Sequence, residues 1–490
     1  MYVSIFHQIK VNTKHKTDEI KLAHFSIKEY LLSNYVKEHH DKQIKAFSLS
    51  QEHSHFMMSQ TCLAYLLEFK TSELVAKFPL MMYAAKNWIF HTQSISDEKS
   101  QQSPLSQLMM KLLTPDNPAF VNWVEIYDPW DASKHLPPLY YTCKAGLIKV
   151  THNLLKSGID VNTWMEGEYT CVLQVALYEG HEAVATLLIE NGADVNAQGG
   201  YYGNALQIAS RKGQEEIAKL LIEKGADVDA QGQKYGTALQ IASYEGQEAF
   251  AKLLIENGAD VNAQGGVYGN TLQVALLQGH KAIAKLLIEN GADVNAQGQK
   301  YGTALQIASY EGQEAIVKLL IENGADLNAQ GGEYGSALQI ASYKCNEAIA
   351  KLLIEKGADV NAQGGHYGNA LQIASYKDHK EIAKLLIENG ADVNAQGGEY
   401  GHALQVALLQ GCKTISKLLI ENGAYVNQGG LYENALRAAI YDGHGELAKL
   451  LIENETDVNA QGGHNGNALQ IASYKGQEEI AQYGSVLLLM

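Results

Sequence analysis

The string GCKT at residues 411–414 is the strongest candidate in this sequence for a phosphate-binding loop. Nucleotide-binding loops of the form GxxxxGK[ST] hold phosphates with backbone amides and a lysine, and need a glycine directly before that lysine. Here Cys412 precedes Lys413, and the string GHKA at 279–282 occupies the equivalent place elsewhere in the chain. The string is therefore expected to begin a helix, and the chain is not expected to hydrolyse nucleotides.

Histidine pairs are the next candidates for chemistry. His53 and His55 lie in EHSHF, and His39 and His40 lie in KEHHDK, two polar segments typical of a protein surface. A zinc site needs Cys or His pairs that converge from two segments, and no second pair is present. The five cysteines form no CxxC pair, and neither GxSxG nor HExxH occurs. The sequence therefore predicts no metal, no cofactor and no enzymatic activity.

Composition excludes several classes of function. The formal net charge of −16 over 490 residues argues against a nucleic-acid partner, which requires a basic surface. No apolar run approaches the roughly 18 residues of a membrane span, and the longest candidate is interrupted by Lys86. The segment MYVSIFHQIKVNTKHK lacks the apolar core of a signal peptide, and sparse cysteines are typical of a reducing compartment. We expect a cytoplasmic protein without membrane contact, with the nucleus as the alternative location.

The elements that would position any site belong to two kinds of polypeptide. All seven prolines lie at or before Pro138, and all 45 glycines lie from Gly146 onward. Residues 1–136 carry 14 lysines and 14 acidic residues, so the whole net charge of −16 lies beyond them. The sequence therefore predicts a small domain at 1–136 and a second region at 137–490.

The second region is repetitive. The string A-L-Q-[IV]-A recurs at a 33-residue spacing, with looser copies upstream and one 32-residue step. The leucines of these copies are Leu139, Leu173, Leu206, Leu239, Leu272, Leu305, Leu338, Leu371, Leu404, Leu436 and Leu469. They define eleven units, of which the last is incomplete.

Each unit predicts two short helices. In YGTALQIASYEGQEAIVKLLIENGADLNAQGGE, apolar residues follow helical spacing before Gly312 and again up to Gly324, where glycine can close a helix. The remaining ADLNAQGGEYG is typical of an extended turn. A helix–turn–helix–loop unit is too small to bury its own apolar face, so the units must stack. The predicted fold is an all-α solenoid behind a small helical domain.

The repeat resembles the ankyrin repeat, whose hallmarks are TPLHxA, a central G-H and LLxxGADVN at a period of 33. KLLIENGADVNAQG at 252–265 matches the second half closely, and the resemblance covers about 350 residues. TPLH is replaced here by variants of NALQ. In the family, the threonine and histidine of TPLH tie the turn by hydrogen bonds, and Gln207 with Asn204, or its equivalent with Thr237, is expected to substitute.

The N-terminal region has a second resemblance. The segments 21–32, 60–69 and 78–91 are similar to the helical region that follows the nucleotide-binding NACHT domain in fungal NACHT–ankyrin signalling proteins. An unrelated helical cap over the first repeat is the alternative. Both interpretations predict helices that contact the first repeats.

Positions that vary between near-identical units are candidates for recognition. In ankyrin proteins the loop tip and the exposed end of the first helix line a concave groove that holds partners. The loop-tip series is Tyr201, Lys234, Val267, Lys300, Glu333, His366, Glu399, Leu431 and His464. The helix-end series is Tyr178, Arg211, Tyr244, Leu277, Tyr310, Tyr343, Tyr376, Leu409, Tyr441 and Tyr474. The next position along the helix reads Glu179, Lys212, Glu245, Gln278, Glu311, Lys344, Lys377, Gln410, Asp442 and Lys475.

The helix-end series has two interpretations. Tyrosine and arginine are enriched at interaction hot spots, which favours a partner surface. Seven of its ten residues are tyrosine, which equally fits a stacking ladder between repeats. The tyrosines that precede the loop glycine hardly vary, as in Tyr334 and Tyr367, and are expected to be structural.

The end of the array departs from the repeat pattern. Tyr425 replaces an aspartate, Glu455 replaces a glycine, and the last unit ends in AQYGSVLLLM instead of a polar cap. We expect residues 460–490 to be frayed or aggregation-prone.

The expected function is non-enzymatic binding of a protein partner, as the ligand-sensing part of a NACHT–ankyrin-type receptor without its nucleotide-binding domain. The alternative is a free-standing scaffold or adaptor that presents partners to an enzyme. A small-molecule enzyme is disfavoured because no group of catalytic residues breaks the repeat period. Partner identity and oligomeric state stay open.

Overall fold

Helices dominate the described part of the chain. A computed structural model describes residues 51–68, 79–95, 104–114, 117–129, 136–165, 167, 169–232, 236–265, 269–298, 302–398, 401–427, 435–454, 456–457, 468–474 and 476. The chain divides into two compact units, residues 1–200 and residues 201–490. Segment 21–32 lies outside the described residues, as does the stretch 460–490 except for 468–474, which form a helix, and 476, so the predictions made for the undescribed parts stay predictions.

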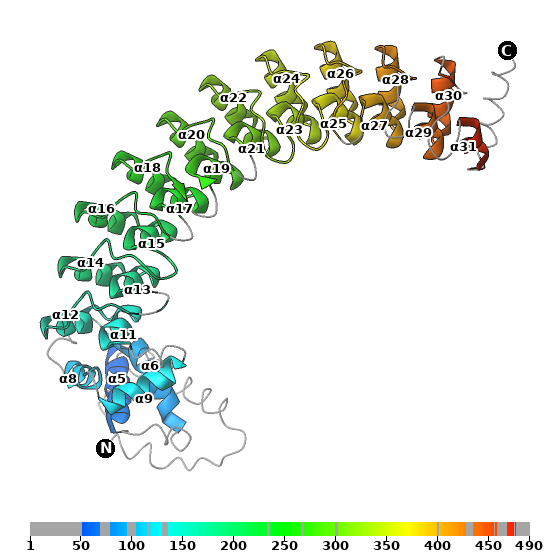
Figure 1. The fold of residues 1–490 in the computed structure, drawn as a ribbon. Helices are drawn as coiled ribbons and strands as arrows, with labels where there is room; N and C mark the ends of the chain where they lie inside the picture. The colour runs from blue at the N-terminus through cyan, green and yellow to red at the C-terminus, as the bar shows by residue number, and fades with distance from the viewer. Residues whose placement is uncertain are drawn as a thin grey trace, which may run out of the picture. The chain divides into compact units, whose positions relative to one another are not determined.

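The first unit opens, in its described part, with four helices: α5 (Gln51–Glu68), α6 (Pro79–Gln93), α8 (Pro104–Leu112) and α9 (Pro118–Tyr127) (Figure 1). Three of them begin at a proline, whose missing N–H has no helical partner at that position anyway. Trp88 and Trp123 are buried with ring centroids 5.5 Å apart, and Trp123 Nε1 donates to the carbonyl oxygen of Ala85 at 3.0 Å. Two buried tryptophans in contact with each other therefore lie at the centre of this core.

The same core continues into the first repeats. These are the helix pairs α11 (Pro138–Lys144) with α12 (Ile148–Lys156), and α13 (Val172–Tyr178) with α14 (Glu182–Glu190). Tyr141 packs its ring 5.7 Å from Phe120 and 5.4 Å from Trp123, and Gln93 Nε2 donates to the carbonyl oxygen of Ala145 at 2.6 Å. The predicted contact between N-terminal helices and the first repeat is confirmed.

The second unit is a row of helix pairs. Its first helices are α15 (Ala205–Lys212), α17 (Ala238–Glu245), α19 (Thr271–Leu277), α21 (Ala304–Tyr310), α23 (Ala337–Tyr343), α25 (Ala370–Lys377), α27 (Ala403–Leu409), α29 (Ala435–Tyr441) and α31 (Ala468–Tyr474). Its second helices are α16 (Glu215–Glu223), α18 (Glu248–Glu256), α20 (Lys281–Glu289), α22 (Glu314–Glu322), α24 (Glu347–Glu355), α26 (Lys380–Glu388), α28 (Lys413–Glu421) and α30 (Gly445–Glu453). The all-α solenoid predicted from the repeats is confirmed.

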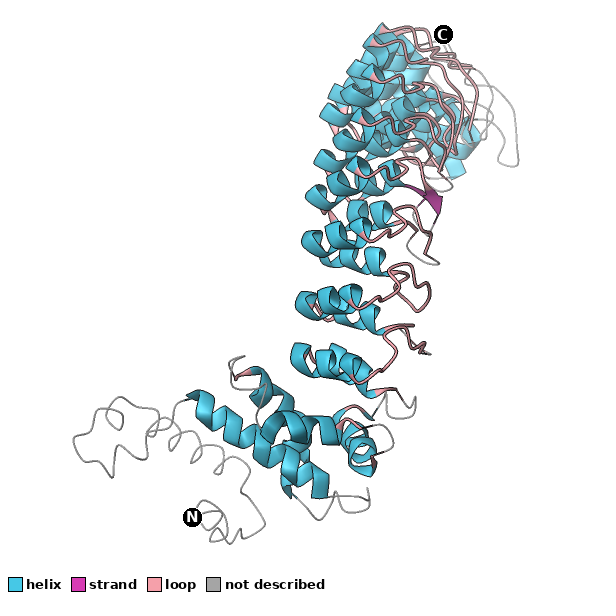
Figure 2. Cartoon of the chain, turned by 90° about the vertical axis from the view of Figure 1, so that its left-hand side faces the viewer, coloured by secondary structure: helices cyan, strands magenta, loops and turns pink. Residues whose placement is uncertain are grey.

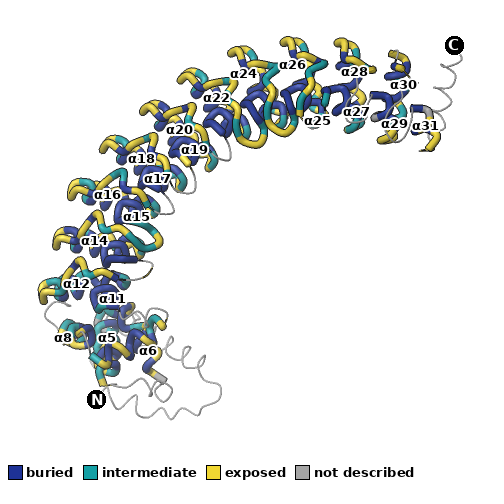
Figure 3. Tube along the Cα trace, viewed as in Figure 1, coloured by how far each residue is buried: buried dark blue, intermediate teal, exposed yellow. Residues whose placement is uncertain are grey.

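Within this unit the row curves. The first helices line the inside of the curve and the second helices the outside (Figure 1). The first helices are almost wholly buried, whereas the second helices expose their outer sides (Figure 3). The apolar stripe of each second helix faces the row, as Ile316 and Leu320 of α22 do, and its lysines and glutamates face outward.

The connecting loops gather along one side of the second unit (Figure 2). They are narrow hairpins: β1 (Gln264–Gly265) pairs antiparallel with β2 (Gly269–Asn270), and single bridges such as Gly298–Gly302 occur at equivalent places. Gly302 has a φ of 75°, and a Cβ there would lie 1.9 Å from the Oε1 atom of Gln306. A glycine is therefore required at this position for two reasons, backbone conformation and space.

A buried glutamine joins most repeats of the second unit to the next. The Oε1 atom of Gln306 accepts a hydrogen bond from the backbone N–H of Thr303 at 2.5 Å, and the backbone N–H of Gln306 donates to Thr303 Oγ1 at 3.4 Å. Its Nε2 donates to the carbonyl oxygens of Ala329 and Gly331 at 3.2 Å each, and to that of Gly335. Corresponding inter-repeat bonds are made by Gln207, Gln240, Gln273, Gln339 and Gln372.

This arrangement confirms that glutamine replaces the histidine of the TPLH motif. Asn204 and Gln207 form the same reciprocal cap as Thr237 and Gln240, in which each side chain accepts from the backbone of the other. The cap satisfies two backbone donors at the start of the helix, and the amide group then reaches the following loop. The turn is tied inside the repeat and between repeats by one side chain.

A second row of bonds runs along the exposed edge. Asn262 Nδ2 donates to the carbonyl oxygen of Gly291 at 3.2 Å, and the backbone N–H of Asp293 donates to Asn262 Oδ1 at 2.7 Å. Tyr425 keeps this bond, because its backbone N–H donates to Asn394 Oδ1 at 2.7 Å whatever its side chain is. The Asp-to-Tyr exchange expected to damage the array therefore leaves this link intact, while Glu455 lies outside the described residues.

Candidate functional site

The helix-end series lies in the last turn of the first helices. Each member stands four residues after the buried glutamine position, so it shares that helix face one turn further on. In the second unit the members Arg211, Tyr244, Leu277, Tyr310, Tyr343, Tyr376 and Leu409 are all half-buried. In the first unit, Tyr178 at the end of α13 is half-buried and packs its ring 5.4 Å from that of Tyr169.

The loop-tip series is described at three positions. Tyr201, Glu333 and His366 are all exposed, and Tyr201 keeps 48% of its surface. The remaining members, Lys234, Val267, Lys300, Glu399, Leu431 and His464, lie outside the described residues. Solvent therefore reaches every loop-tip side chain that the structure describes.

Tyrosines from two of the sequence series alternate in one ladder. Ring centroids lie 5.8 Å apart for Tyr310 and Tyr334, 4.6 Å for Tyr334 and Tyr343, 6.0 Å for Tyr343 and Tyr367, and 5.2 Å for Tyr367 and Tyr376. The structural role expected for Tyr334 and Tyr367 is confirmed. The alternation, which places a loop tyrosine between successive helix ends, was not predicted from the sequence.

Lysines cover the ladder from the following repeat. Lys344 Nζ lies 3.7 Å from the ring centroid of Tyr310, and Lys377 Nζ lies 4.2 Å from that of Tyr343. Each such contact contributes about 0.5–1 kcal/mol when exposed to solvent. The ladder is therefore a mixed surface of rings and cations, and half-burial leaves part of every ring open to a partner.

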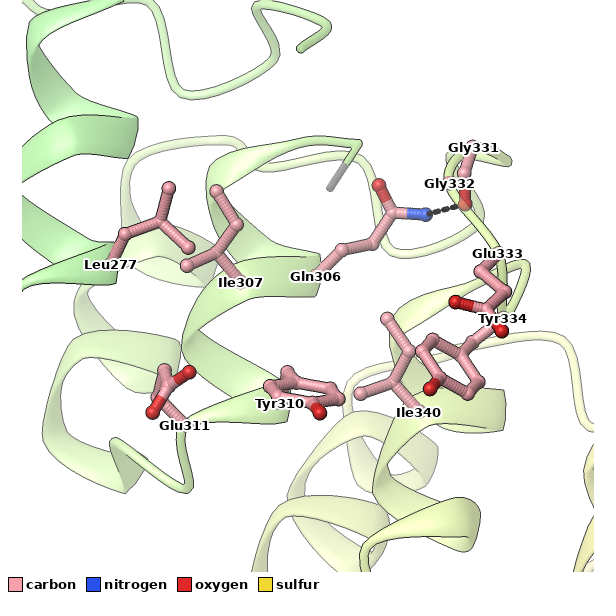
Figure 4. A pocket seen from close by; sticks show the side chains of 10 residues that line it. All are labelled: Leu277, Gln306, Ile307, Tyr310, Glu311, Gly331, Gly332, Glu333, Tyr334 and Ile340. Atoms are coloured by element: carbon pink, nitrogen blue, oxygen red, sulfur yellow. Dashed lines mark hydrogen bonds between the residues drawn. The ribbon is translucent and has the colours of Figure 1, made fainter. Parts of the chain in front are cut away.

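A pocket of about 240 Å³ lies at one end of this ladder (Figure 4). It is lined by Leu277, Gln306, Ile307, Tyr310, Glu311, Gly331, Gly332, Glu333, Tyr334 and Ile340. Leu277 and Ile307 lie together on one side, and Glu333 and Tyr334 approach from the loop on the other (Figure 4). The structure thus brings together Leu277, Tyr310 and Glu333, which sequence analysis selected from two separate series.

The ring of Tyr334 carries the clearest electrostatic signature at the pocket. Partial burial, the neighbouring Tyr343 and the carboxylate of Glu333 raise the pKa of Tyr334 to about 12. The phenol is therefore neutral at physiological pH and keeps its hydroxyl hydrogen. The raised pKa also marks this end of the groove as a place where additional negative charge is disfavoured.

The cysteine thiols are poor nucleophiles. Burial raises the pKa of Cys62 to about 11 and that of Cys143 to about 12. Burial, together with Asp378, raises the pKa of Cys412 to about 12. Thiolate is the reactive form, so these thiols are unreactive at neutral pH.

His55 corrects one prediction. It was expected on the surface, but it is buried at 7% exposure, with Nδ1 at 2.8 Å from Nδ1 of His91. His91 Nε2 lies 2.9 Å from the hydroxyl of Tyr83 on the same helix. The polar composition of EHSHF did not predict that His55 faces α6. His39, His40 and the side chain of His53 lie outside the described residues.

The GCKT string begins a helix, as predicted. Cys412 is the N-cap of α28, and Lys413 pairs with Glu446 of the next repeat at 3.1 Å. Within the described ranges, no group of three or more His, Cys, Asp and Glu side chains is arranged to hold a metal ion. Among the same residues, no helix has the combined length and apolar character needed to cross a membrane.

Comparisons with known proteins identify the repeats. A family model of ankyrin repeats in three copies matches residues 200–265, 272–364, 305–397, 338–430 and 404–483, and a model of ankyrin repeats in many copies matches 173–222. "Azaphilone pigments biosynthesis cluster protein L" of Monascus ruber is 30% identical over 200 residues, which cover 36% of this chain and 41% of that protein. The chain thus spans about two fifths of the length of that relative. Ankyrin repeats are a protein-interaction architecture, and since their models match more than half of the sequence, this chain belongs to the ankyrin-repeat family.

Proposed function

We propose that this chain is a non-enzymatic binder that holds an extended segment of a protein partner against the inner face of its repeats. One observation carries the proposal: the side chains that vary between repeats gather at the ends of the first helices and in the loops. The unvarying polar side chains are instead used in bonds between repeats, as Gln306 and Asn262 are. Variation is therefore concentrated at side chains that these inter-repeat hydrogen bonds do not use.

The inner face also has the composition of an interaction surface. Half-buried tyrosines supply large contact areas at low entropic cost, and Glu333 and His366 add exposed polar groups beside them. Sparse cysteines that form no CxxC pair fit a cytoplasmic location for this binding, with the nucleus as the alternative.

Comparative co-purification tests the proposal. The full chain is tagged, crosslinked in its native cells and compared with a variant that carries Tyr244→Ala, Tyr343→Ala and Tyr376→Ala. A matched variant carries Lys252→Ala, Lys318→Ala and Lys384→Ala on the outer helices, where those side chains are exposed. We expect loss of partner enrichment with the inner set only. Equal enrichment for all three proteins would contradict the proposal.

Within this function, we propose that the array is the ligand-sensing part of a NACHT–ankyrin-type receptor and that residues 1–136 relay the event. The aromatic packing of Tyr141 on Phe120 and Trp123 supports a relay, because it joins the first repeat to the N-terminal helices. Sequencing the native transcript upstream of the Met1 codon tests this. A continuous reading frame that encodes GxxxxGK[ST] would support the receptor, and a frame without it would contradict it.

The alternative is a scaffold or adaptor that presents partners to an enzyme. The name of the Monascus ruber relative refers to pigment biosynthesis, which gives this alternative separate support. The same transcript distinguishes the two, together with the identity of crosslinked partners: an enzyme among them favours the adaptor.

A further inference from the structure

The pocket lies where one helix-end tyrosine of the repeat pattern is replaced by leucine. Leu277 stands at the helix-end position where Tyr244, Tyr310 and Tyr343 stand in other repeats. Tyr310 stacks toward Tyr334 on one side, and on the other side the pocket is closed by the smaller Leu277. Leucine at position 277 thus presents a smaller side chain to the pocket than the tyrosine of neighbouring repeats would.

The pocket wall is apolar and aromatic. Leu277, Ile307 and Ile340 supply hydrocarbon surface, and Tyr310 and Tyr334 supply rings. Gln306 is not available to a ligand as a donor, because its Nε2 is committed to carbonyl oxygens such as that of Gly331 (Figure 4). An occupant is therefore expected to place an unbranched apolar stem against this wall.

Two carboxylates complete the pocket. Glu311 and Glu333 are both exposed, and the structure describes no ion pair for either, whereas glutamates of the outer helices pair with lysines, as Glu322 does with Lys318 at 4.0 Å. Lys344 is an opposing charge nearby in the described part of the chain, and its Nζ lies 3.7 Å from the ring centroid of Tyr310. Among the charged groups that the structure describes around the pocket, two carboxylates against one ammonium leave an excess of negative charge.

An apolar stem that ends in a cation satisfies both parts of the pocket. Lysine and arginine have such side chains: they bury their methylenes and keep the charged head near carboxylates and ring faces. The volume of about 240 Å³ is below the roughly 300–1,000 Å³ of drug-sized sites, so it suits a single side chain. We propose that this pocket receives a lysine or arginine side chain of the protein partner. The inference rests on the proposed function and specifies the chemistry of its partner.

Each test variant introduces a residue that already occurs at the equivalent position of another repeat. Leu277→Tyr restores the residue of the neighbouring repeats and fills the pocket. Glu311→Lys introduces the residue found at Lys344, and Glu333→Lys introduces the residue found at Lys300. Leu409→Tyr makes the same exchange as Leu277→Tyr four repeats away and serves as the matched control.

Methyl NMR of the full chain measures the proposed contact directly. Isoleucine and leucine methyl groups are labelled, and the signals of Ile307 and Ile340 are followed during titration with N-acetyl-lysine methylamide and N-acetyl-arginine methylamide. N-acetyl-norleucine methylamide, which keeps the stem and lacks the cation, is the control ligand. We expect saturable shifts for the two cationic probes and at least about fivefold weaker binding of norleucine.

The variants then separate charge from shape. Glu311→Lys and Glu333→Lys are each expected to weaken lysine binding about fivefold or more, Leu277→Tyr to abolish it, and Leu409→Tyr to leave it unchanged. Equal binding of norleucine, or shifts that leave Ile307 and Ile340 unmoved, would overturn the inference. Since the probes need no natural partner, this result is independent of co-purification: a partner captured equally by wild type and both Glu variants refutes the pocket and leaves the proposed function standing.

Discussion

The glutamine position and the helix-end position recur at the same period, four residues apart, with Arg437 in place of one glutamine and Arg211, Leu277 and Leu409 in place of three tyrosines. They differ in what their neighbours demand of them. Gln306 is 1% exposed and joins Thr303 to the next loop through both atoms of its amide, a geometry that requires an acceptor and a donor on one planar group. Tyr310 and Tyr343 are half-buried and make ring contacts, which do not require one defined partner.

This difference explains why one row is nearly invariant and the other is not. Loss of the glutamine leaves buried carbonyl oxygens without a donor, which costs more than the hydrogen bond contributes. Loss of a tyrosine ring leaves an apolar contact that leucine can partly make, as Leu277 and Leu409 do. Periodicity therefore does not separate structure from recognition, and the partners of each side chain do.

Removing one glutamine is expected to have the largest effect. Gln306→Leu should destabilise its repeat by about 2–4 kcal/mol, because the buried backbone groups it serves lose their partner. Hydrogen exchange of the backbone amides at 302–307 and 331–336 measures the local change, which suits a repeat array better than a single unfolding midpoint. Gln278→Leu, at an exposed helix end, is the control and should change stability by less than about 0.5 kcal/mol. Similar exchange rates in the two variants would contradict the comparison.

Removing one tyrosine should cost less. Tyr343 stacks 4.6 Å from Tyr334 and 6.0 Å from Tyr367, and Lys377 covers its ring. Tyr343→Leu should cost about 1–2 kcal/mol, since an aromatic pair contributes about 0.5–1.5 kcal/mol and leucine retains part of the apolar contact. Urea denaturation measures the loss. Tyr474→Leu, at 86% exposure, should be nearly silent, and a comparable loss there would show that the ladder contacts contribute little.

One substitution is expected to stabilise the array. Cys345 has a φ of 57° at the position where Gly312 has 66°, and a left-handed backbone disfavours residues with a Cβ. Cys345→Gly should gain about 0.5–1 kcal/mol, after the greater entropy of glycine in the unfolded chain is offset. Cys345→Ala removes the thiol and keeps the strain, so its urea midpoint should stay at or below that of the wild type. An increase in stability with Cys345→Ala would show that the effect comes from loss of the thiol and not from the backbone conformation.

Sequence reasoning succeeded where the physics is local. The ends of α21 and α22 follow from glycines and helical spacing, and the role of Gln207 with Asn204 follows from the cap geometry of neighbouring residues. It did not predict what depends on distances between repeats. The meeting of Leu277 with Glu333 needs the rise from one unit to the next, and the burial of His55 needs the packing of α5 on α6. The sequence alone gives neither the rise between repeats nor the packing of these two helices.

The smallest expected effect concerns the pKa of Tyr334, the loop tyrosine that lines the pocket. Burial, Tyr343 and Glu333 raise the pKa of Tyr334 to about 12, so the folded state favours the neutral phenol. The resulting contribution to stability is fully present below the ordinary tyrosine pKa of about 10 and is lost as the pH rises toward 12. Phenolate absorbance in an alkaline titration should therefore lose a late-titrating group in Tyr334→Phe. Glu333→Gln should lower the pKa of Tyr334, whereas Glu245→Gln, on a distant helix end, should leave it in place. An unchanged late transition in Glu333→Gln would mean that the carboxylate does not face the ring, and that the negative charge ascribed to the pocket is absent from its wall.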